Sequence, residues 1–558
     1  MPFHFQRIRH WGACGKTHVL PHNRRPMSDP VEEVRGKWQL MDVAVDVVVV
    51  GAGPTGLMLA GELGQAGIRT LLLERRPEPS EMAKAGGLAG QILQLLHYRG
   101  ELDRFREASI GATGRRRGPR DSEPAPRFPF GGLHLDFAQL EDSPMRAMLL
   151  PQPRLEGVLA ERAIERGADV RRGHEVVGLH QDDDAVTVEV RGPDGAYEVA
   201  ARFLVGCDGG RSRVRDLAGI PFPGTSFPEI ERLASVTVPD WVTVLDDGGL
   251  DVPGVGRIPF GYTATERGVF ACSGMGGTMG VYTAEVEATE YDDDVPMTVA
   301  ELSASVSRVL GIDLPLGEPL RMTRFGYSAK QADRYRDGRV FLAGDAAHLF
   351  PAGGVAVNAG MLDAANLAWK LAGSVHGWAP HGLLDTYSDE RRAAAERTLL
   401  HTRAQVALRR GYGPGGDALR ALFLELTADE QPLRRLGALM AGTDVGSPMS
   451  KEHPLVGTFT TDRALHVDHE DPRSAGLLRK GRPVLLDLAE HADLRELAGQ
   501  WGGRVDVVRA TIDERPADAL LIRPDALIAW AAVVDAPGET ALPALREALT
   551  TWFGAAST

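Results

Sequence analysis

The sequence predicts a protein of the α/β class, in which a parallel sheet is interrupted by an antiparallel β domain. Val47 to Val50 are four β-branched residues in succession, which is typical of a strand buried on both faces of a parallel sheet. Residues 220–340 instead alternate apolar and polar positions in short runs that end at Gly and Pro, as antiparallel strands do. We therefore expect a Rossmann-like domain that carries an inserted antiparallel sheet.

The turn after Val50 has the G-x-G-x-x-G spacing, with Gly51, Gly53 and Gly56 in the three positions. The first glycine allows a tight turn, the second lets the backbone approach a pyrophosphate, and the third lets the next helix pack on the strand. That helix, Thr55 to Gln65, directs its free N–H groups and the positive end of its dipole toward the phosphates.

A second apolar strand, Thr70 to Leu73, leads to Glu74, eighteen positions after Gly56. An acid at this distance accepts hydrogen bonds from the ribose hydroxyls of an adenosine. The strand, the glycine turn, the helix and the acid together predict a dinucleotide-binding unit. The alternative is a β-α-β unit whose glycines serve only packing.

Length and composition narrow the class of protein. A chain of 558 residues allows two or three domains, and a net charge of −14 disfavours nucleic acid or an anionic membrane as partner. Cys14, Cys207 and Cys272 are far apart and lack a C-x-x-C spacing, which argues against a disulfide framework or a zinc site and suits a reducing compartment. No apolar run reaches the roughly 18 residues needed to cross a bilayer. We expect a soluble, cytoplasmic protein.

Residues 1–43 precede the first domain. The segment carries Arg7, Arg9, Lys16, Arg24 and Arg25, and it lacks the apolar core of a secretory signal or a membrane anchor. We expect a disordered extension, with a targeting role as the alternative.

Between Glu74 and residue 220 the patterns predict further helices and strands. Residues 109–147 are expected to be rich in loops and to expose the basic run Arg115 to Arg117. The predicted helices are Lys84 to Leu96 and Leu155 to Arg166, and the predicted strands are Val170 to Arg172, Glu175 to Gln181, Ala185 to Arg191 and Phe203 to Val205.

After the β domain the chain is expected to return to the first domain through residues 339–351. A glycine-rich loop at 351–360 precedes a helix through Met361 to Ala372, a longer helix covers Leu383 to Arg410, and Gly411 to Gly416 ends it. The predicted regions are the extension at 1–43, the first domain at 44–220, the β-sheet domain at 221–330, the return with long helices at 331–450 and a tail at 455–558.

The tail has its own pattern of elements. Strands are predicted at Pro483 to Leu488, Val505 to Arg509, Leu520 to Arg523 and Leu527 to Ala532, and helices at His491 to Trp501 and Leu542 to Phe553. This β-α-β-β-β-α order resembles thioredoxin, but the tail contains no cysteine. Thiol redox chemistry is therefore excluded for it.

Three separated motifs carry a resemblance to a known family. They are GAGPTG at 51–56, CDGGRSRVR at 207–215 and GRVFLAGDAAHLFPAGG at 338–354. Together they resemble the group A flavoprotein monooxygenases, which have the p-hydroxybenzoate hydroxylase fold, over Val45 to about Leu408. The cysteine-free thioredoxin-like tail makes the chain most similar to the aromatic polyketide and phenol hydroxylases, enzymes of antibiotic biosynthesis among them.

The resemblance implies a function. We expect bound FAD, reduction by NADPH or NADH, reaction with O2 to a flavin C4a-hydroperoxide, and hydroxylation of a polycyclic phenol or quinone. The chemistry then needs neither a metal nor an amino-acid nucleophile. The small aromatic substrate, O2 and NAD(P)H are the expected partners, and homodimerisation is left open. The run Arg115 to Arg117 is a candidate contact for the phosphate of NADPH.

The resemblance also implies site residues. Asp345 is expected to bind a ribityl hydroxyl of FAD, with an N-cap role in the following helix as its alternative. The amides of Asn358, Ala359 and Gly360 are expected to open a helix whose positive end faces the flavin N1–C2=O edge. The cofactor-binding residues are Gly51, Gly53, Pro54, Thr55, Gly56, Glu74, Arg75, Gln91, Gln152, Asp208, Gly209, Gly344, Asp345, Gly353, Gly354, Val355, Ala356, Val357 and Asn358, and those nearest the chemistry are Pro351, Asn358 and Gly360.

The chain departs from the family pattern at two places. Val355-Ala356 stands where the family usually has Gln-Gly, and Gln91 stands where it often has Arg. The first change dries the substrate side of the flavin, and the second weakens one phosphate contact.

Several roles stay open from the sequence. His348 is a candidate general base or a hydrogen-bonded structural residue, and Arg213 and Arg215 are candidate contacts in the NADPH groove or plain surface residues. Phe222, Phe260, Tyr262 and Tyr282 line the substrate pocket or belong to the core. Alternative functions are a Baeyer–Villiger or oxidative-rearrangement enzyme, a halogenase, which the absence of W-x-W-x-I-P disfavours, and a non-catalytic flavoprotein.

Overall fold

The computed structural model describes residues 39–40, 45–80, 85–109, 127–246, 248–275, 278–286, 295–351, 354–444, 453–466, 474–535 and 538–557. The chain has two units, Met1–Gln39 and Leu40–Thr558. Of the first unit only Gln39, in strand β1 (Gln39–Leu40), is described. In the described residues no helix is long and apolar enough to span a membrane. The predicted extension and the run Arg115 to Arg117 lie outside the described residues.

The first sheet of the second unit confirms the Rossmann-like prediction. Its strands follow the order β20-β21-β11-β2-β3-β8, and β21, β11, β2, β3 and β8 run parallel. Strand β2 is buried on both faces, as its run of valines predicts. The bounds are β2 Val45–Val50, β3 Thr70–Glu74, β8 Asp169–Arg172, β9 Glu175–Gln181, β10 Val186–Gly192, β11 Gly195–Gly206, β20 Arg336–Asp337 and β21 Val340–Leu342.

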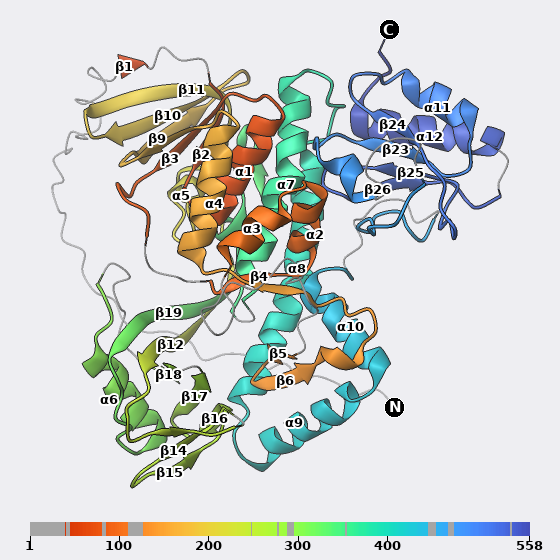
Figure 1. The fold of residues 1–558 in the computed structure, drawn as a ribbon. Helices are drawn as coiled ribbons and strands as arrows, with labels where there is room; N and C mark the ends of the chain where they lie inside the picture. Colours follow the sequence, from red (N-terminus) through yellow and green to blue (C-terminus); the bar gives the residue numbers. More distant parts are fainter. Residues whose placement is uncertain are drawn as a thin grey trace, which may run out of the picture. The chain divides into compact units, whose positions relative to one another are not determined.

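Helices pack on this sheet and on each other. Helix α1 lies between α4 and α7 (Figure 1). The bounds are α1 Pro54–Gln65, α2 Gln91–Tyr98, α3 Leu102–Ala108, α4 Gln152–Glu165, α5 Arg213–Leu217 and α7 Ala356–Val375, with a short 3-10 turn, η3, at Gly344–Ala346.

The segment Lys84 to Leu96 is not the single helix that its spacing predicted. Strand β4 (Gly87–Ala89) pairs with β7 (Ala147–Leu149), and α2 begins only at Gln91. The break falls at Gly90, whose φ of 73° is left-handed and ends the strand. The spacing of apolar residues at i, i+3 and i+4 does not distinguish a short buried strand from the first turn of a helix.

The stretch 109–147 is also more ordered than expected where it is described. Strands β5 (Arg127–Phe130) and β6 (Leu133–Asp136) form a hairpin, and the 3-10 turn η2 (Phe137–Gln139) follows. Gly131 and Gly132 both have positive φ, so the tight connection needs glycine there.

An antiparallel sheet of the order β16-β17-β18-β12-β19-β22 confirms the prediction for residues 220–340. One face is covered by α6 (Val299–Leu310), a helix that begins at the Thr298 cap and ends at Gly311. The other face meets helix α8 (Asp385–Arg410) (Figure 1). The bounds are β12 Gly224–Thr237, β16 Gly261–Thr265, β17 Gly268–Met275, β18 Thr278–Val286, β19 Pro319–Gln331 and β22 His348–Leu349, with a small sheet of β13 Thr243–Val244, β14 Leu250–Val252 and β15 Gly256–Ile258.

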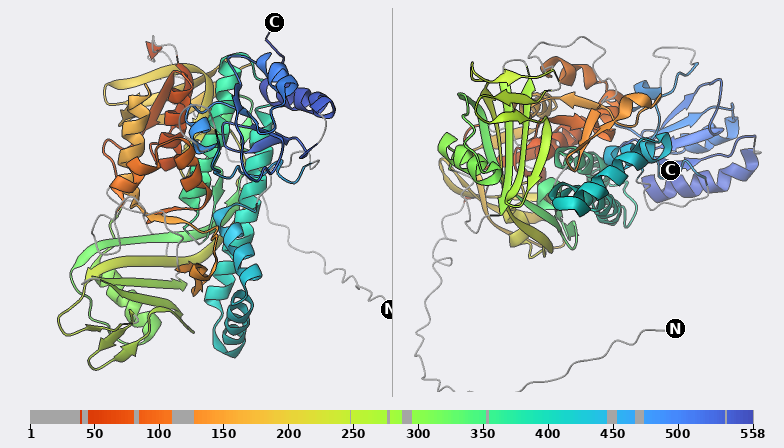
Figure 2. Two further views of the ribbon diagram at one scale, coloured as in Figure 1. Left: turned by 45° about the vertical axis from the view of Figure 1, so that its right-hand side comes forward. Right: turned by 90° about the horizontal axis from the view of Figure 1, so that it is seen from below.

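A long helix, α8 (Asp385–Arg410), runs from the first domain to the β domain, as Figure 2 shows. The predicted break at Gly411 to Gly416 is confirmed, and a separate helix begins within it. Gly411 and Tyr412 end α8, and the remaining glycines form the first turn of α9 (Gly413–Thr427), where Pro414 favours a helix start. Helix α10 (Glu430–Ala441) follows.

The tail has the predicted β-α-β-β-β-α order. Its sheet runs β24-β23-β25-β26, with β23 and β24 parallel and the other pairs antiparallel. The bounds are β23 Val484–Asp487, α11 Ala492–Gly499, β24 Asp506–Arg509, β25 Ala519–Ile522, β26 Ile528–Ala531 and α12 Gly538–Phe553, after the turn η4 at Ser474–Leu478. Trp369 of α7 belongs to the same apolar cluster as the tail, so the two are packed together (Figure 2).

Candidate active site

The glycine turn after β2 leaves open space at the start of α1. A Cβ at Gly51 would lie 2.4 Å from the carbonyl oxygen of Cys207, and one at Gly56 would lie 2.0 Å from that of Gly51. A Cβ at Gly53 would meet no described atom within 4 Å. Two of the three glycines are therefore required by packing, while Gly53 borders a gap at the helix N-terminus. This gap is where a pyrophosphate would meet free N–H groups.

The electrostatics of that helix end favour an anion. Pro54 occupies the first turn, and no acidic residue lies there to neutralise the dipole. Glu74, at the end of β3, accepts hydrogen bonds from the amides of Ala52 at 2.8 Å and Arg76 at 2.9 Å. Its carboxylate is thereby held beside the glycine turn. Each oxygen keeps a lone pair for a ribose hydroxyl, while Arg75 is exposed next to it.

A second turn, at Asp208 and Gly209, follows β11. Asp208 accepts hydrogen bonds from Ser212 Oγ at 2.5 Å and from the amide of Val214 at 3.1 Å, so it shapes the start of α5. Burial raises the pKa of Asp208, against the hydrogen bonds that lower it.

Arg215 is a structural residue rather than a surface one. Its guanidinium donates to the carbonyl oxygens of Gly210 at 3.0 Å and Ala346 at 3.1 Å, and it lies 3.9 Å from the ring centroid of Phe222. Arg215 therefore joins the Asp208 turn to the Gly344–Asp345 turn, and Phe222 packs against the core of the first domain.

Three predicted motifs meet at Gly344. Its φ is 61°, and a Cβ on it would lie 2.5 Å from Thr55 Oγ1. A Cβ on Gly360 of α7 would lie 2.3 Å from the same atom. The glycine turn, the Gly344–Asp345 turn and α7 are thus in direct van der Waals contact, and only glycine fits at both positions.

Asp345 has an exposed side chain within η3. The alternative N-cap role is wrong, because Ala343 is the N-cap of η3 and Val355 that of α7. The carboxylate is accessible to a ligand at this turn.

The start of α7 differs from the prediction. The helix begins at Ala356, and the amide of Ala359 already donates to the carbonyl oxygen of Val355 at 3.0 Å. The free amides are those of Ala356, Val357 and Asn358, whereas those of Ala359 and Gly360 are used inside the helix. The predicted start at Asn358 lies two residues after the observed one, because small apolar residues carry no capping signal. Gly353 lies outside the described residues.

Asn358 ties α7 to the neighbouring strand. Its Oδ1 accepts a hydrogen bond from the amide of Ala89 in β4 at 2.9 Å, and its Nδ2 donates to the carbonyl oxygen of Gly354 at 3.3 Å. Pro351 is buried beside this loop, and Val355, Ala356 and Val357 are half-buried. The side chain of Asn358 therefore holds the first turn of α7 to β4, while its backbone amide belongs to that first turn, where the helix leaves amides unused.

Gln152 and Gln91 are placed near β4. Gln152 accepts from the amide of Ala85 at 3.0 Å, which holds the entry to β4, and donates to Glu156 of its own helix, α4, at 2.8 Å. Gln91 is buried at the first position of α2.

His348 is buried, and its Nε2 lies 2.6 Å from Oδ2 of Asp363. This contact favours the structural alternative for His348. Asp363 was not singled out in the sequence, since a carboxylate inside a helical pattern gives no signal of its partners.

The β domain holds a second buried polar cluster that sequence reasoning missed. Glu231 of β12 is fully buried and accepts hydrogen bonds from Tyr282 and from Arg409 of α8. Tyr282 is thus a core residue. Phe260 and Tyr262 are 41% and 40% exposed, so they are the exposed members of the four predicted aromatics, and the ring of Tyr262 also packs edge-on against that of Tyr282, 5.5 Å away.

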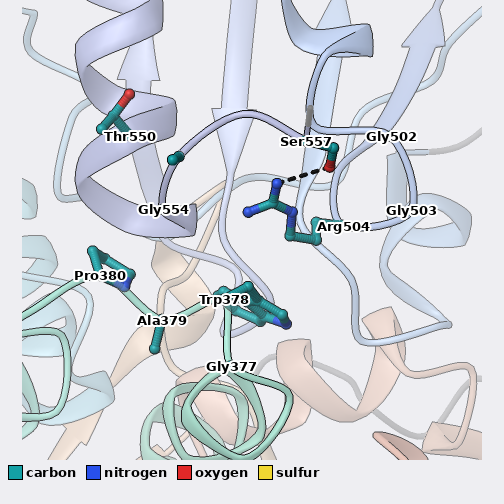
Figure 3. A pocket seen from close by; sticks show the side chains of 11 residues that line it. Gly377, Trp378, Ala379, Pro380, Gly502, Gly503, Arg504, Thr550, Gly554 and Ser557 are labelled. Atoms are coloured by element: carbon teal, nitrogen blue, oxygen red, sulfur yellow. Dashed lines mark hydrogen bonds between the residues drawn. The ribbon is translucent and has the colours of Figure 1, made fainter.

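A pocket of about 670 Å³ lies away from these turns, between the loop after α7 and the end of the tail (Figure 3). Arg504 points into this region and donates to the carbonyl oxygen of Phe553 at 2.8 Å and to Ser557 Oγ at 2.9 Å. None of the predicted cofactor residues lines this pocket.

Two family models identify the class of the protein that contains these turns. A model described as "FAD binding domain" matches residues 44–402, and one described as "Aromatic-ring hydroxylase, C-terminal" matches residues 453–556. The chain therefore belongs to the FAD-binding aromatic-ring hydroxylases. The residues around Gly53 fit the group, because a Cβ there would meet no described atom within 4 Å and the first turn of α1 offers free amides.

Individual relatives narrow this class to the monooxygenases. The chain is 40% identical to a 12-dehydrotetracycline 5-monooxygenase/anhydrotetracycline 6-monooxygenase of Streptomyces rimosus, over 91% of this chain and 99% of the relative. It is 36% identical to a dialkyldecalin synthase of Streptomyces rugosporus, over 92% and 99% of the two chains. The crystal structure of CabE, an aromatic hydroxylase from angucycline biosynthesis, matches with a TM-score of 0.80 and 36% identity, over 92% and 100% of the chains. The protein is an FAD-dependent monooxygenase, and the recognition and the fold class predicted from the three motifs are confirmed.

Proposed function

We propose that this monooxygenase is reduced by NADPH and hydroxylates a polycyclic aromatic substrate of the polyketide type, a phenol or a quinone. The observation that carries the proposal is the near full-length similarity to a monooxygenase named for anhydrotetracycline and to an aromatic hydroxylase of angucycline biosynthesis. The substrate class fits a role in antibiotic biosynthesis. The Baeyer–Villiger alternative and the non-catalytic alternative find no support in these comparisons.

The first part of the proposal assigns the cofactor residues. The pyrophosphate of FAD lies at Gly53 and the first turn of α1, its adenosine ribose at Glu74, and its ribityl chain at Asp345. Support comes from the open space at Gly53, the fixed carboxylate of Glu74 and the exposed carboxylate of Asp345. When bound, FAD supplies the two-electron chemistry by which O2 is activated.

The second part concerns the charge at the flavin edge. The first turn of α7 has no acidic residue and offers the amides of Ala356, Val357 and Asn358. Preorganised N–H groups and the positive helix end stabilise negative charge that develops beside them. The side chains of Val355 and Ala356 are half-buried and apolar, so they exclude water from the same place.

The protein's partners follow from the same chemistry. We place the enzyme in the cytoplasm, where NADPH and O2 are available, and its net charge of −14 gives no attraction to nucleic acid or to anionic lipid. Homodimerisation stays part of the proposal without a surface assigned to it.

The proposal is tested with purified enzyme, NADPH and a panel of tetracyclic phenols and quinones. We expect NADPH oxidation to accelerate with at least one panel member, and mass spectrometry to find one atom from isotopically labelled O2 in the product. Product formed without NADPH consumption would instead indicate a non-redox reaction, such as the name of the dialkyldecalin synthase suggests for that relative.

A further inference from the structure

We infer that Asp363 is a positioning residue for the cofactor, because it fixes the Gly344–Asp345 turn to helix α7 and to α8. The inference rests on the proposed contact between FAD and this turn. It extends that proposal to a residue whose side chain is fully buried.

Three donors from three different elements converge on Asp363. Oδ2 accepts from the backbone amide of Gly344 at 3.0 Å and lies 2.6 Å from Nε2 of His348 in β22. Oδ1 accepts from Nε of Arg391 in α8 at 2.6 Å. The carboxylate therefore links the turn, the strand and the helix.

The geometry requires a carboxylate rather than an amide. A carboxylate is acceptor-only, whereas an asparagine presents one oxygen and one N–H2 group. In an asparagine at this position the N–H2 group would face either Arg391 or the pair of Gly344 and His348, and a buried donor would lose its acceptor.

The negative charge of Asp363 is compensated by His348 and Arg391, which contact its carboxylate. Burial alone would raise its pKa, but His348 and Arg391 outweigh burial and hold the pKa of Asp363 below its ordinary value. The side chain is thus ionised and makes charge-assisted hydrogen bonds, which are the strong kind.

Movement of this turn would reach both sides of the cofactor site. Gly344 is in tight contact with Thr55 of the glycine turn and with Gly360 of α7. The strand before the turn is held separately, because Tyr387 donates to the carbonyl oxygen of Leu342 at 2.7 Å. Loss of Asp363 should therefore disturb the turn while β21 stays in the sheet.

The test compares D363N with a matched control, D487N. Asp487 in the tail is also fully buried, and it accepts hydrogen bonds from the amides of Ala489 and His491 and from Arg495. FAD affinity is measured by titrating apoprotein, and the visible spectrum of the bound flavin is recorded. We expect at least a roughly tenfold weaker affinity and a spectrum closer to free FAD for D363N. For D487N we expect an affinity within about twofold of wild type, although its melting temperature falls.

Two further variants keep the inference open to refutation if D363N does not fold. H348L removes one donor to Asp363, and we expect weaker FAD binding; H348Q replaces the donor and should restore it. D363N or H348L with an affinity within about threefold of wild type, or D487N with the same loss as D363N, would overturn the inference. If wild-type apoprotein itself takes up no FAD, the proposed cofactor site fails instead, so the two failures are distinguishable.

Discussion

Replacing Arg523 with methionine should loosen the C-terminal domain from helices α7 and α8. Arg523 is fully buried in the turn between β25 and β26. It donates to Glu390 of α8 at 2.7 and 2.8 Å and to Asp525 at 2.5 and 3.0 Å. Its guanidinium also lies 5.2 Å from the ring centroid of Trp369 in α7 and 4.4 Å from that of Trp552 in α12.

The cost follows from the charges that remain. Without Arg523, two buried carboxylates face one cation, Lys370, which lies 3.0 Å from Glu390. Removing one partner of a buried ion pair costs about 3–5 kcal/mol, because the other charge is left uncompensated. The control is R509M: Arg509 and Glu490 form a pair in the same domain in which both side chains are 54% exposed. Such a pair contributes at most about 1 kcal/mol.

The assay is urea unfolding followed by tryptophan fluorescence, since Trp369 and Trp552 flank the substituted residue. We expect the fluorescence transition of R523M to begin at a urea concentration at least about 1 M lower than that of wild type. The transition of R509M should coincide with that of wild type. The reasoning would be refuted by equal midpoints for R523M and wild type, or by an equal loss in R509M.

Two further predictions concern the glycine turn and the β domain. G53A should fold with unchanged melting temperature but bind FAD at least tenfold more weakly, because its methyl group enters the open space; G51A should lose stability instead, since its Cβ would lie 2.4 Å from the carbonyl oxygen of Cys207. Burial raises the pKa of Glu231 to about 7 from an ordinary 4.5, against Arg409, which lowers it. The folded state therefore binds a proton that the unfolded state has lost, and this contribution to stability is complete below pH 4.5 and disappears as the pH rises through about 7. E231Q should flatten the dependence of the urea midpoint on pH across this window, and an unchanged slope would contradict the assignment.

The elements that the sequence predicted well are those with an unambiguous period or motif. The valine run of β2, the alternating strands of the β domain and the tail order all follow from burial of one or both faces. Lys84 to Leu96 was misassigned because three residues of β4 are too few to show a period of two, and only the pairing with β7 makes them a strand. Helix starts at Ala356 and Gly413 were missed for a related reason: neither has a polar capping residue.

The residues proposed to contact the cofactor could be predicted from the sequence, whereas the buried residues that hold them in place could not. Gly53 and Glu74 stand in a motif whose spacing predicts their place, and the structure brings them together through the amide of Ala52. Asp363 depends on partners nineteen residues before it and twenty-eight residues after it. Such pairings are set by packing of α7 against α8 and leave no local pattern in the chain. For the same reason, nothing in the sequence distinguishes Glu231 from an ordinary polar residue of a strand.

The most direct test of the account combines a spectrum with a turnover measurement on the purified protein. We predict flavin absorption bands from bound FAD, bleaching by NADPH without oxygen, and transfer of one labelled oxygen atom to a polycyclic phenol or quinone when O2 is admitted. A colourless protein that takes up no added FAD, or a flavoprotein that NADPH does not reduce with any substrate present, would contradict it.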